Sequence, residues 1–71
     1  MHPATAMVFE FFAYEHLPPH LQEVSKPCAE LAQKVATDLV DDPEVTVGLR
    51  KLLEAKDCFV RAAVRAHRRA G

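Results

Sequence analysis

Residues 41–67 read DDPEVTVGLRKLLEAKDCFVRAAVRAH, a segment with the start signal, the apolar spacing and the end composition of one long amphipathic α-helix. Asp42 suits the N-cap position because its side chain can accept hydrogen bonds from free helix amides, and Pro43 suits the first helical position. Apolar side chains then recur at three- and four-residue steps, while arginines gather at the C-terminal end, where the helix dipole favours cations. We therefore predict a helix over residues 42–67, about 40 Å long.

A first long helix is predicted before this segment, over residues 20–40. Its apolar side chains recur at helical spacing and would lie along one face. Pro27 lies inside the pattern, where a proline removes one backbone hydrogen bond and crowds the preceding turn. Either the helix is kinked near Pro27, or it begins at Ser25 as N-cap with Pro27 in its first turn.

Residues 1–19 are expected to form a short N-terminal arm, because Pro18 and Pro19 end any helix that begins before them. The aromatic segment from Met7 to Leu17 fits neither a strand alternation nor a clean helical stripe, and we expect one or two helical turns in it. The link between the long helices is short, so they should pack as an antiparallel hairpin. The predicted fold is all-α, with residues 1–71 forming a single helical domain.

The size of the chain predicts a homo-oligomer. A chain of 71 residues hides only about 60% of the surface that its unfolded form exposes. A two-helix hairpin covers one apolar stripe on each helix and leaves the flanks open. Gly48 costs about 1 kcal/mol relative to Ala inside a helix, which indicates either close approach of another backbone or a tolerated glycine. The side chains expected at contacts between subunits are Val47, Leu53, Val60 and the phenylalanines of the arm.

Composition narrows the classes of partner and compartment. The formal net charge is −1 and the isoelectric point is near 6.4, so no global basic field would hold long nucleic acid or an anionic membrane. Cys28 and Cys58 fit neither a CxxC motif nor a metal-ligand spacing, which is typical of a reducing compartment. The N-terminal segment lacks the basic region of a signal peptide, and no apolar run reaches the roughly 18 residues of a membrane span. We expect a soluble, cytoplasmic protein.

Catalytic and metal-binding motifs are not found in the sequence. No Ser, Cys or Thr stands in a nucleophile motif with a base and an orienting group. His16 and His20 have the spacing of helical metal ligands, but two prolines separate them, and a surface pair is the better interpretation. The acidic residues around Asp42 are more often helix caps than cation ligands. We expect no enzymatic activity, no metal and no cofactor.

Two features could serve ligand binding, although each has an ordinary structural explanation. The arginines at the C-terminal end of the second long helix usually form a solvated helix end that complements the dipole. Tyr14 and its neighbouring phenylalanines could stack on bases, but such side chains more often belong to a core. Lys26 on its own would be an unremarkable surface lysine. The arginines are Arg61, Arg65, Arg68 and Arg69.

Four short motifs occur in a particular order along the chain. They are F-x-Y at 12–14, E-L-A at 30–32 with a basic residue shortly before it, P-E-x-T at 43–46, and L-R-K-L-L-E-A-K-D at 49–57. Together they resemble the phage anti-CBASS sponge family, which is related to the sponges that oppose Thoeris defence. Members of that family are small helical proteins that sequester the cyclic oligonucleotide signals of bacterial immunity without cleaving them. The likeness covers about residues 7–65, and it departs at Glu15, which separates Tyr14 from His16.

The resemblance implies a homo-oligomer, a hexamer built from dimers, with cyclic dinucleotides bound between protomers in the cytoplasm of an infected bacterial host. It implies that Tyr14 stacks on a base and that Lys26 and Ser25 meet the phosphodiesters. Glu44 or Thr46 would face a base or a ribose. Some members also bind cyclic trinucleotides at a second site, and Arg65 occupies the place of an arginine there. The alternative function is a structural helical-hairpin adaptor that acts through protein–protein contacts; a nucleic-acid-binding helix is least favoured by the near-neutral charge.

Overall fold

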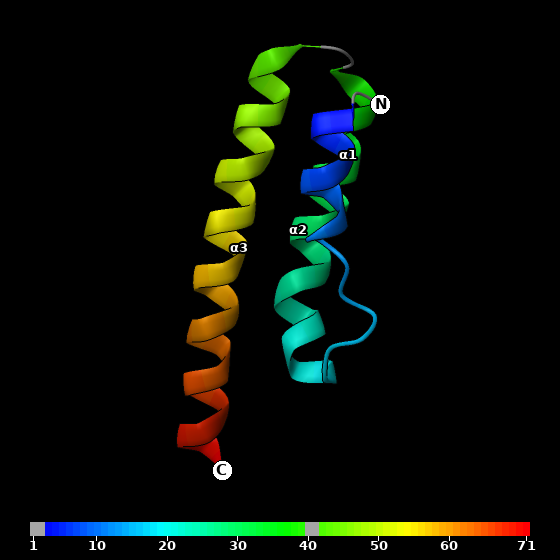
Figure 1. Ribbon diagram of the computed structural model, residues 1–71. Helices are drawn as coiled ribbons and strands as arrows, with labels where there is room; N and C mark the ends of the chain where they lie inside the picture. The colour runs from blue at the N-terminus through cyan, green and yellow to red at the C-terminus, as the bar shows by residue number, and fades with distance from the viewer. Residues whose placement is uncertain (1–2, 40–41) are drawn as a thin grey trace.

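The computed structural model describes residues 3–39 and 42–71, and these form three α-helices and no strand (Figure 1). They are α1 (Pro3–Glu10), α2 (Pro19–Asp38) and α3 (Pro43–Ala70). α2 and α3 lie side by side and run in opposite directions, and α1 packs beside the half of this pair in which α2 ends and α3 begins (Figure 1). The predicted all-helical fold class is confirmed.

α3 begins as its start signal predicts. The Asp42 carboxylate accepts a hydrogen bond from the backbone N–H of Glu44 at 2.9 Å, and Pro43 is the first helical residue. The helix continues to Ala70, three residues beyond the predicted end at residue 67. The extension has a simple cause, because Arg68, Arg69 and Ala70 are all good helix formers and nothing breaks the helix before the terminal glycine.

α2 is one continuous helix that passes through Pro27. Of the two predicted arrangements, the one that starts the helix at Ser25 is wrong, because Ser25 lies inside α2 and its side chain is buried. Pro19 takes the first turn, where the missing amide of a proline costs nothing. α2 ends at Asp38, whereas the prediction extended to residue 40, which lies outside the described residues.

The N-terminal segment contains a regular helix of its own. α1 has eight residues, about two turns, and starts at Pro3, earlier than the aromatic run that suggested helical turns. Successive turns follow it: Phe11 N–H donates to Val8 O at 3.2 Å and Phe12 N–H donates to Phe9 O at 3.0 Å. The connection from α1 to α2 is therefore compact at its start.

The buried core is small. Among the described residues, four apolar side chains are buried: Val8, Phe12, Ala32 and Leu49. The Cα radius of gyration is 13.1 Å, against about 11 Å for a compact domain of this length. The protein is elongated, with extents of 44 × 19 × 17 Å, and so much of its apolar surface has no cover within one chain.

A buried lysine ties the end of α1 to α3. The side chain of Lys56 is almost fully buried, and its Nζ donates a hydrogen bond to the carbonyl oxygen of Phe11 at 3.0 Å. The same Nζ lies 3.0 Å from the Asp57 carboxylate. Carbonyls at a helix C-terminus lack partners within the helix, so Lys56 satisfies a group that would otherwise need water. The contact spans 45 residues of sequence and was not predicted.

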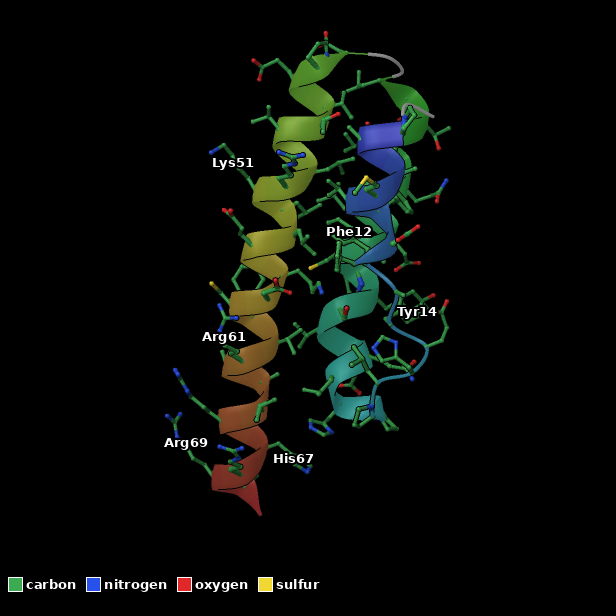
Figure 2. The ribbon with its side chains drawn as sticks, in the orientation of Figure 1. Phe12, Tyr14, Lys51, Arg61, His67 and Arg69 are labelled. Atoms are coloured by element: carbon green, nitrogen blue, oxygen red, sulfur yellow. The ribbon has the colours of Figure 1, made fainter. Side chains whose placement is uncertain are left out.

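We expect Lys56→Met to lower the free energy of unfolding by about 1–3 kcal/mol, because Met keeps the apolar stem but leaves the Phe11 carbonyl without its charged donor. Lys51→Met is the matched control, since Lys51 is exposed on the outer side of the same helix (Figure 2). Urea denaturation at one protein concentration measures both. Equal stability of the two variants would show that the Lys56 contact contributes nothing.

Candidate functional site

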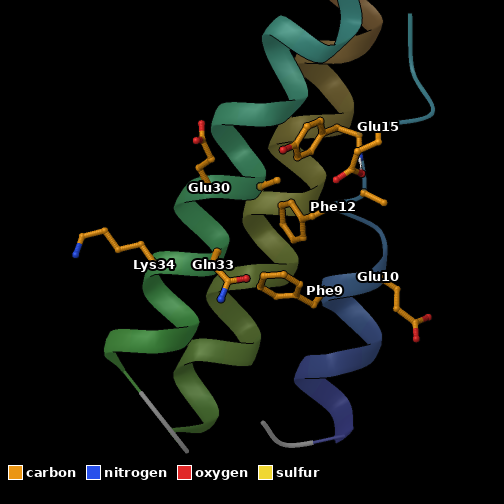
Figure 3. A pocket seen from close by; sticks show the side chains of 10 residues that line it. Phe9, Glu10, Phe12, Glu15, Glu30, Gln33 and Lys34 are labelled. Atoms are coloured by element: carbon orange, nitrogen blue, oxygen red, sulfur yellow. Dashed lines mark hydrogen bonds between the residues drawn. The ribbon is translucent and has the colours of Figure 1, made fainter.

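An open pocket lies between α1, the connection that follows it, and α2 (Figure 3). Its volume is about 590 Å³. Phe12 forms its fully buried base, and the Phe9 ring lies 6.1 Å from the Phe12 ring, tilted by 51°. One wall comes from Phe9, Glu10, Phe12, Ala13, Tyr14 and Glu15, and the other comes from Ala29, Glu30, Gln33 and Lys34.

Tyr14 reaches the pocket from the connection between α1 and α2, and it is partly exposed there. The chain around it is held by local hydrogen bonds: Leu17 N–H donates to Tyr14 O at 3.0 Å. The Gln22 side-chain amide donates to the carbonyls of Glu15 and Leu17 at 3.3 and 2.8 Å. The first turn of α2 thus holds the backbone of the loop that carries Tyr14 beside the pocket.

The pocket is rich in carboxylates. Glu10, Glu15 and Glu30 line it, and all three are exposed. Its one lysine, Lys34, forms an ion pair with Asp38 one turn further along α2. The pocket itself is lined mainly by apolar side chains, and these exposed carboxylates lie at its rim (Figure 3), which suits hydrogen-bond donors such as the N–H groups of bases and disfavours phosphate groups there.

Lys26 lies outside the pocket but on the side of α2 that faces it. It is exposed and stands four residues before Glu30, so the two side chains share one helix face. The structure thereby brings two of the predicted ligand residues, Tyr14 and Lys26, to the same side of the molecule. Helical spacing places Lys26 one turn of α2 before Glu30, outside the set of residues that line the pocket.

Ser25 occupies a different environment from its neighbour Lys26. Its side chain is 0% exposed, and its Oγ has no hydrogen-bond partner. A contact of Ser25 with a phosphodiester does not fit this position, because the hydroxyl is not presented to solvent. The physical reason is the 100° step between consecutive helix residues: when Lys26 faces solvent, Ser25 faces the neighbouring helices.

Glu44 and Thr46 lie at the start of α3, away from Tyr14. The Thr46 hydroxyl is hydrogen-bonded to the hydroxyl of Thr5 on α1 at 2.8 Å, and Glu44 is exposed. Neither residue is among those that line the pocket. Within one chain these residues do not join the pocket.

Arg65 is exposed near the C-terminal end of α3, far along the molecule from the start of that helix. The labelled arginines on either side of it in sequence, Arg61 and Arg69, project away from α2 (Figure 2). Arg61 also donates a hydrogen bond to the Cys58 sulfur at 3.3 Å. These side chains form a basic end that is separate from the pocket.

Two histidines meet at this end of the molecule. The rings of His20 and His67 are stacked, with centroids 3.8 Å apart and planes inclined by 13°. The pairing joins the first turn of α2 to the last turns of α3, and nothing in the local sequence of either residue predicts it. Within residues 3–39 and 42–71, no group of three or more His, Cys, Asp or Glu side chains is arranged to hold a metal ion.

No protein-family model matches the chain, and comparison with the curated proteins and with the solved structures found no significant match. In the part of the chain that the structure describes, no helix has both the length and the apolar character needed to cross a membrane.

Ser25→Ala is expected to keep or raise stability, by up to about 1 kcal/mol, because it removes a buried hydroxyl that makes no hydrogen bond. Thermal unfolding followed by circular dichroism measures the change. Thr46→Ala is the contrasting variant: its hydroxyl is bonded to Thr5, so its loss should cost about 1 kcal/mol. A Ser25→Ala protein less stable than Thr46→Ala would contradict this account of both positions.

Proposed function

We propose that this protein binds cyclic oligonucleotide signals of bacterial immunity, cyclic dinucleotides above all, and sequesters them without cleaving them. The observation that supports this function is the partly exposed Tyr14 at an aromatic-lined pocket. Lys26 lies on the side of α2 that carries the pocket residue Glu30. An aromatic ring offers a surface on which a base can stack, and a lysine offers a charge to a phosphate. The motif order described above supplies the class of ligand.

The distribution of charge orients the ligand in this proposal. The carboxylates of Glu15 and Glu30 accept hydrogen bonds from the N–H groups of a base stacked on Tyr14. The phosphates stay outside, beside Lys26, because the pocket itself would repel them. Base recognition and phosphate neutralisation are thus assigned to different parts of one surface.

The proposed site is completed by a second copy of the chain. Glu44 and Thr46 do not line the pocket that holds Tyr14 within one protomer, so in this proposal they contact ligand from a neighbour in a homo-oligomer. We propose a hexamer built from dimers, acting in the cytoplasm of an infected bacterial host. Arg65 lies apart from the pocket and belongs to a second, cyclic-trinucleotide site in this proposal.

A protein-binding adaptor is the alternative function, and one observation favours it. Met7 and Phe11 are 67% and 65% exposed, the largest values among the exposed large apolar side chains of residues 3–39 and 42–71. They stand four residues apart, so they lie on one side of α1 and its continuation. An exposed apolar pair of this kind suits a contact with another protein.

A thermal-shift comparison separates the two functions. A ligand that binds only the folded protein raises the melting temperature, and the rise grows with the ligand concentration and with the affinity. The sponge proposal expects a concentration-dependent rise with cyclic dinucleotides and none with the corresponding linear dinucleotides. An unchanged melting temperature with cyclic dinucleotides and cyclic trinucleotides alike would favour the adaptor.

Tyr14→Ala should weaken cyclic dinucleotide binding about 10- to 100-fold, since stacking on an aromatic side chain contributes roughly 1–3 kcal/mol per base. Lys26→Glu should weaken it at least as much, because attraction beside a phosphate becomes repulsion. Isothermal titration calorimetry measures the affinities. Lys51→Glu makes the same charge change on the outer side of α3 and should leave affinity unchanged (Figure 2). Arg65→Ala should spare dinucleotide binding and impair trinucleotide binding alone.

Full dinucleotide affinity in both the Tyr14 and Lys26 variants, with circular dichroism showing that they remain folded, would falsify the proposed site. Turnover is tested separately. A cyclic dinucleotide incubated with the protein and released by heat should be recovered intact, as chromatography would show. Recovery of a linear product would replace sequestration with phosphodiester hydrolysis.

A further inference from the structure

α1 covers only one flank of the hairpin that α2 and α3 form. Ala32 is fully buried, and consecutive helix residues differ by about 100° in direction. Gln33, on one side of Ala32, lines the pocket beside α1. Leu31 therefore points to the opposite side, where it is 49% exposed.

The same division holds around α3. Leu49 is buried, and Thr46 lies to the side of it that meets α1, through the hydrogen bond to Thr5. Helical spacing places Gly48 and Phe59 on the other side, and Phe59 is 55% exposed. We call this uncovered side of the hairpin the rear flank, which consists of Val24, Leu31 and Val35 from α2 and Gly48, Leu52, Ala55 and Phe59 from α3.

Gly48 has no role within one chain that would require a glycine. Apart from its chain neighbours and the backbone of its own helix, a Cβ atom added at this position would meet no heavy atom within 4 Å. Gly has a lower helix propensity than Ala, so an exposed helical glycine lowers the stability of the single chain. A contact with another chain that needs the missing side chain would offset this cost. The rear flank thus combines exposed apolar side chains with a point at which another backbone can approach.

Charge is segregated between the two ends of the hairpin. Asp38, Asp42 and Glu44 lie where α2 ends and α3 begins. The opposite end carries Arg61, Arg65, Arg68 and Arg69 from α3, in which no acidic residue follows Asp57, and Glu23 from the beginning of α2, so its charge is on balance positive. Each molecule therefore has one acidic and one basic end.

We propose that a second copy of this chain occupies the rear flank, related by a two-fold axis that lies between the copies and runs across the helices. α3 then packs antiparallel on α3 of the partner, and α2 packs on α2, which gives a four-helix core. The acidic end of each copy meets the basic end of the other. The alternative two-fold packing, with its axis along the hairpin, brings like-charged ends together and is disfavoured for that reason.

The sequence of α3 defines a register for this contact. Gly48, Ala55 and Ala62 recur every seven residues, and Ala55 lies near the middle of the helix. A two-fold axis at Ala55 places Gly48 opposite the partner's Ala62, so a small residue meets a small residue at each step. In the same register Glu44 comes within one turn of the partner's Arg65 and the partner's Arg69.

This dimer deepens the proposed function by naming the face that begins its assembly. Its tests measure mass and covalent linkage without nucleotide, so the dimer and the sponge function can fail independently. A correct dimer that binds no cyclic nucleotide would leave the assembly standing. A nucleotide-binding protein without this dimer would overturn the present inference alone.

Gly48→Leu is the first test, because leucine favours the helix and blocks the close approach. We expect the chain to stay helical by circular dichroism and its dimer dissociation constant, from sedimentation equilibrium, to rise at least 10-fold. Arg50→Leu places the same side chain on the flank that α1 covers and should leave the constant unchanged. A wild-type mass of 7.9 kDa over the micromolar range, or wild-type association by Gly48→Leu, would overturn the proposal.

The register is tested by cross-linking in a chain that carries Cys28→Ala and Cys58→Ser. Ala55→Cys in this background should form a covalent dimer under mild oxidation, since the two positions face each other across the axis. Ala62→Cys is the control: its two copies would be about 20 Å apart in an antiparallel pair, too far for a disulfide. Efficient linkage at position 62 but not at position 55 would exclude the register.

Discussion

The close contact between α2 and α3 is the constraint on which the other features depend. Ala32 and Leu49 belong to one buried cluster, in which a small side chain on α2 allows a large side chain on α3 to approach. The contact fixes the rotation of both helices about their axes. Once these rotations are set, every other residue of α2 and α3 is assigned to a flank, including those that line the pocket and those that remain uncovered.

α1 completes the structure on one flank only. Phe12 and Val8 bring two of the buried apolar side chains to the cluster, and Lys56 holds the end of α1 through the Phe11 carbonyl. The placement of α1 creates the pocket, because the end of α1 and the connection that follows it form one wall and side chains of α2 form the other. Stability and the proposed ligand site therefore share the same contacts, and loosening α1 would be expected to affect both.

The small core has a consequence for assembly. Hydrophobic stabilisation scales with the apolar area removed from water, and an elongated chain removes little of it alone. Leu31 and Phe59 are left largely exposed on the rear flank. Because the two ends of the hairpin differ in charge, the proposed dimer is antiparallel: the acidic end of each copy lies beside the basic end of the other.

Local chemistry in the sequence determined the helices. The Asp42–Pro43 pair marks the start of α3, the Pro18–Pro19 pair marks the start of α2, and apolar spacing predicts both long helices, because caps, prolines and periodicity act within a few residues. Tertiary structure decided how these helices are rotated and which distant side chains meet. The burial of Ser25 and Lys56, the stacking of His20 on His67 and the acidic character of the pocket all depend on such meetings. A helix pattern gives the width of an apolar face but not its partner, and long-range contacts therefore decide which polar residues it buries.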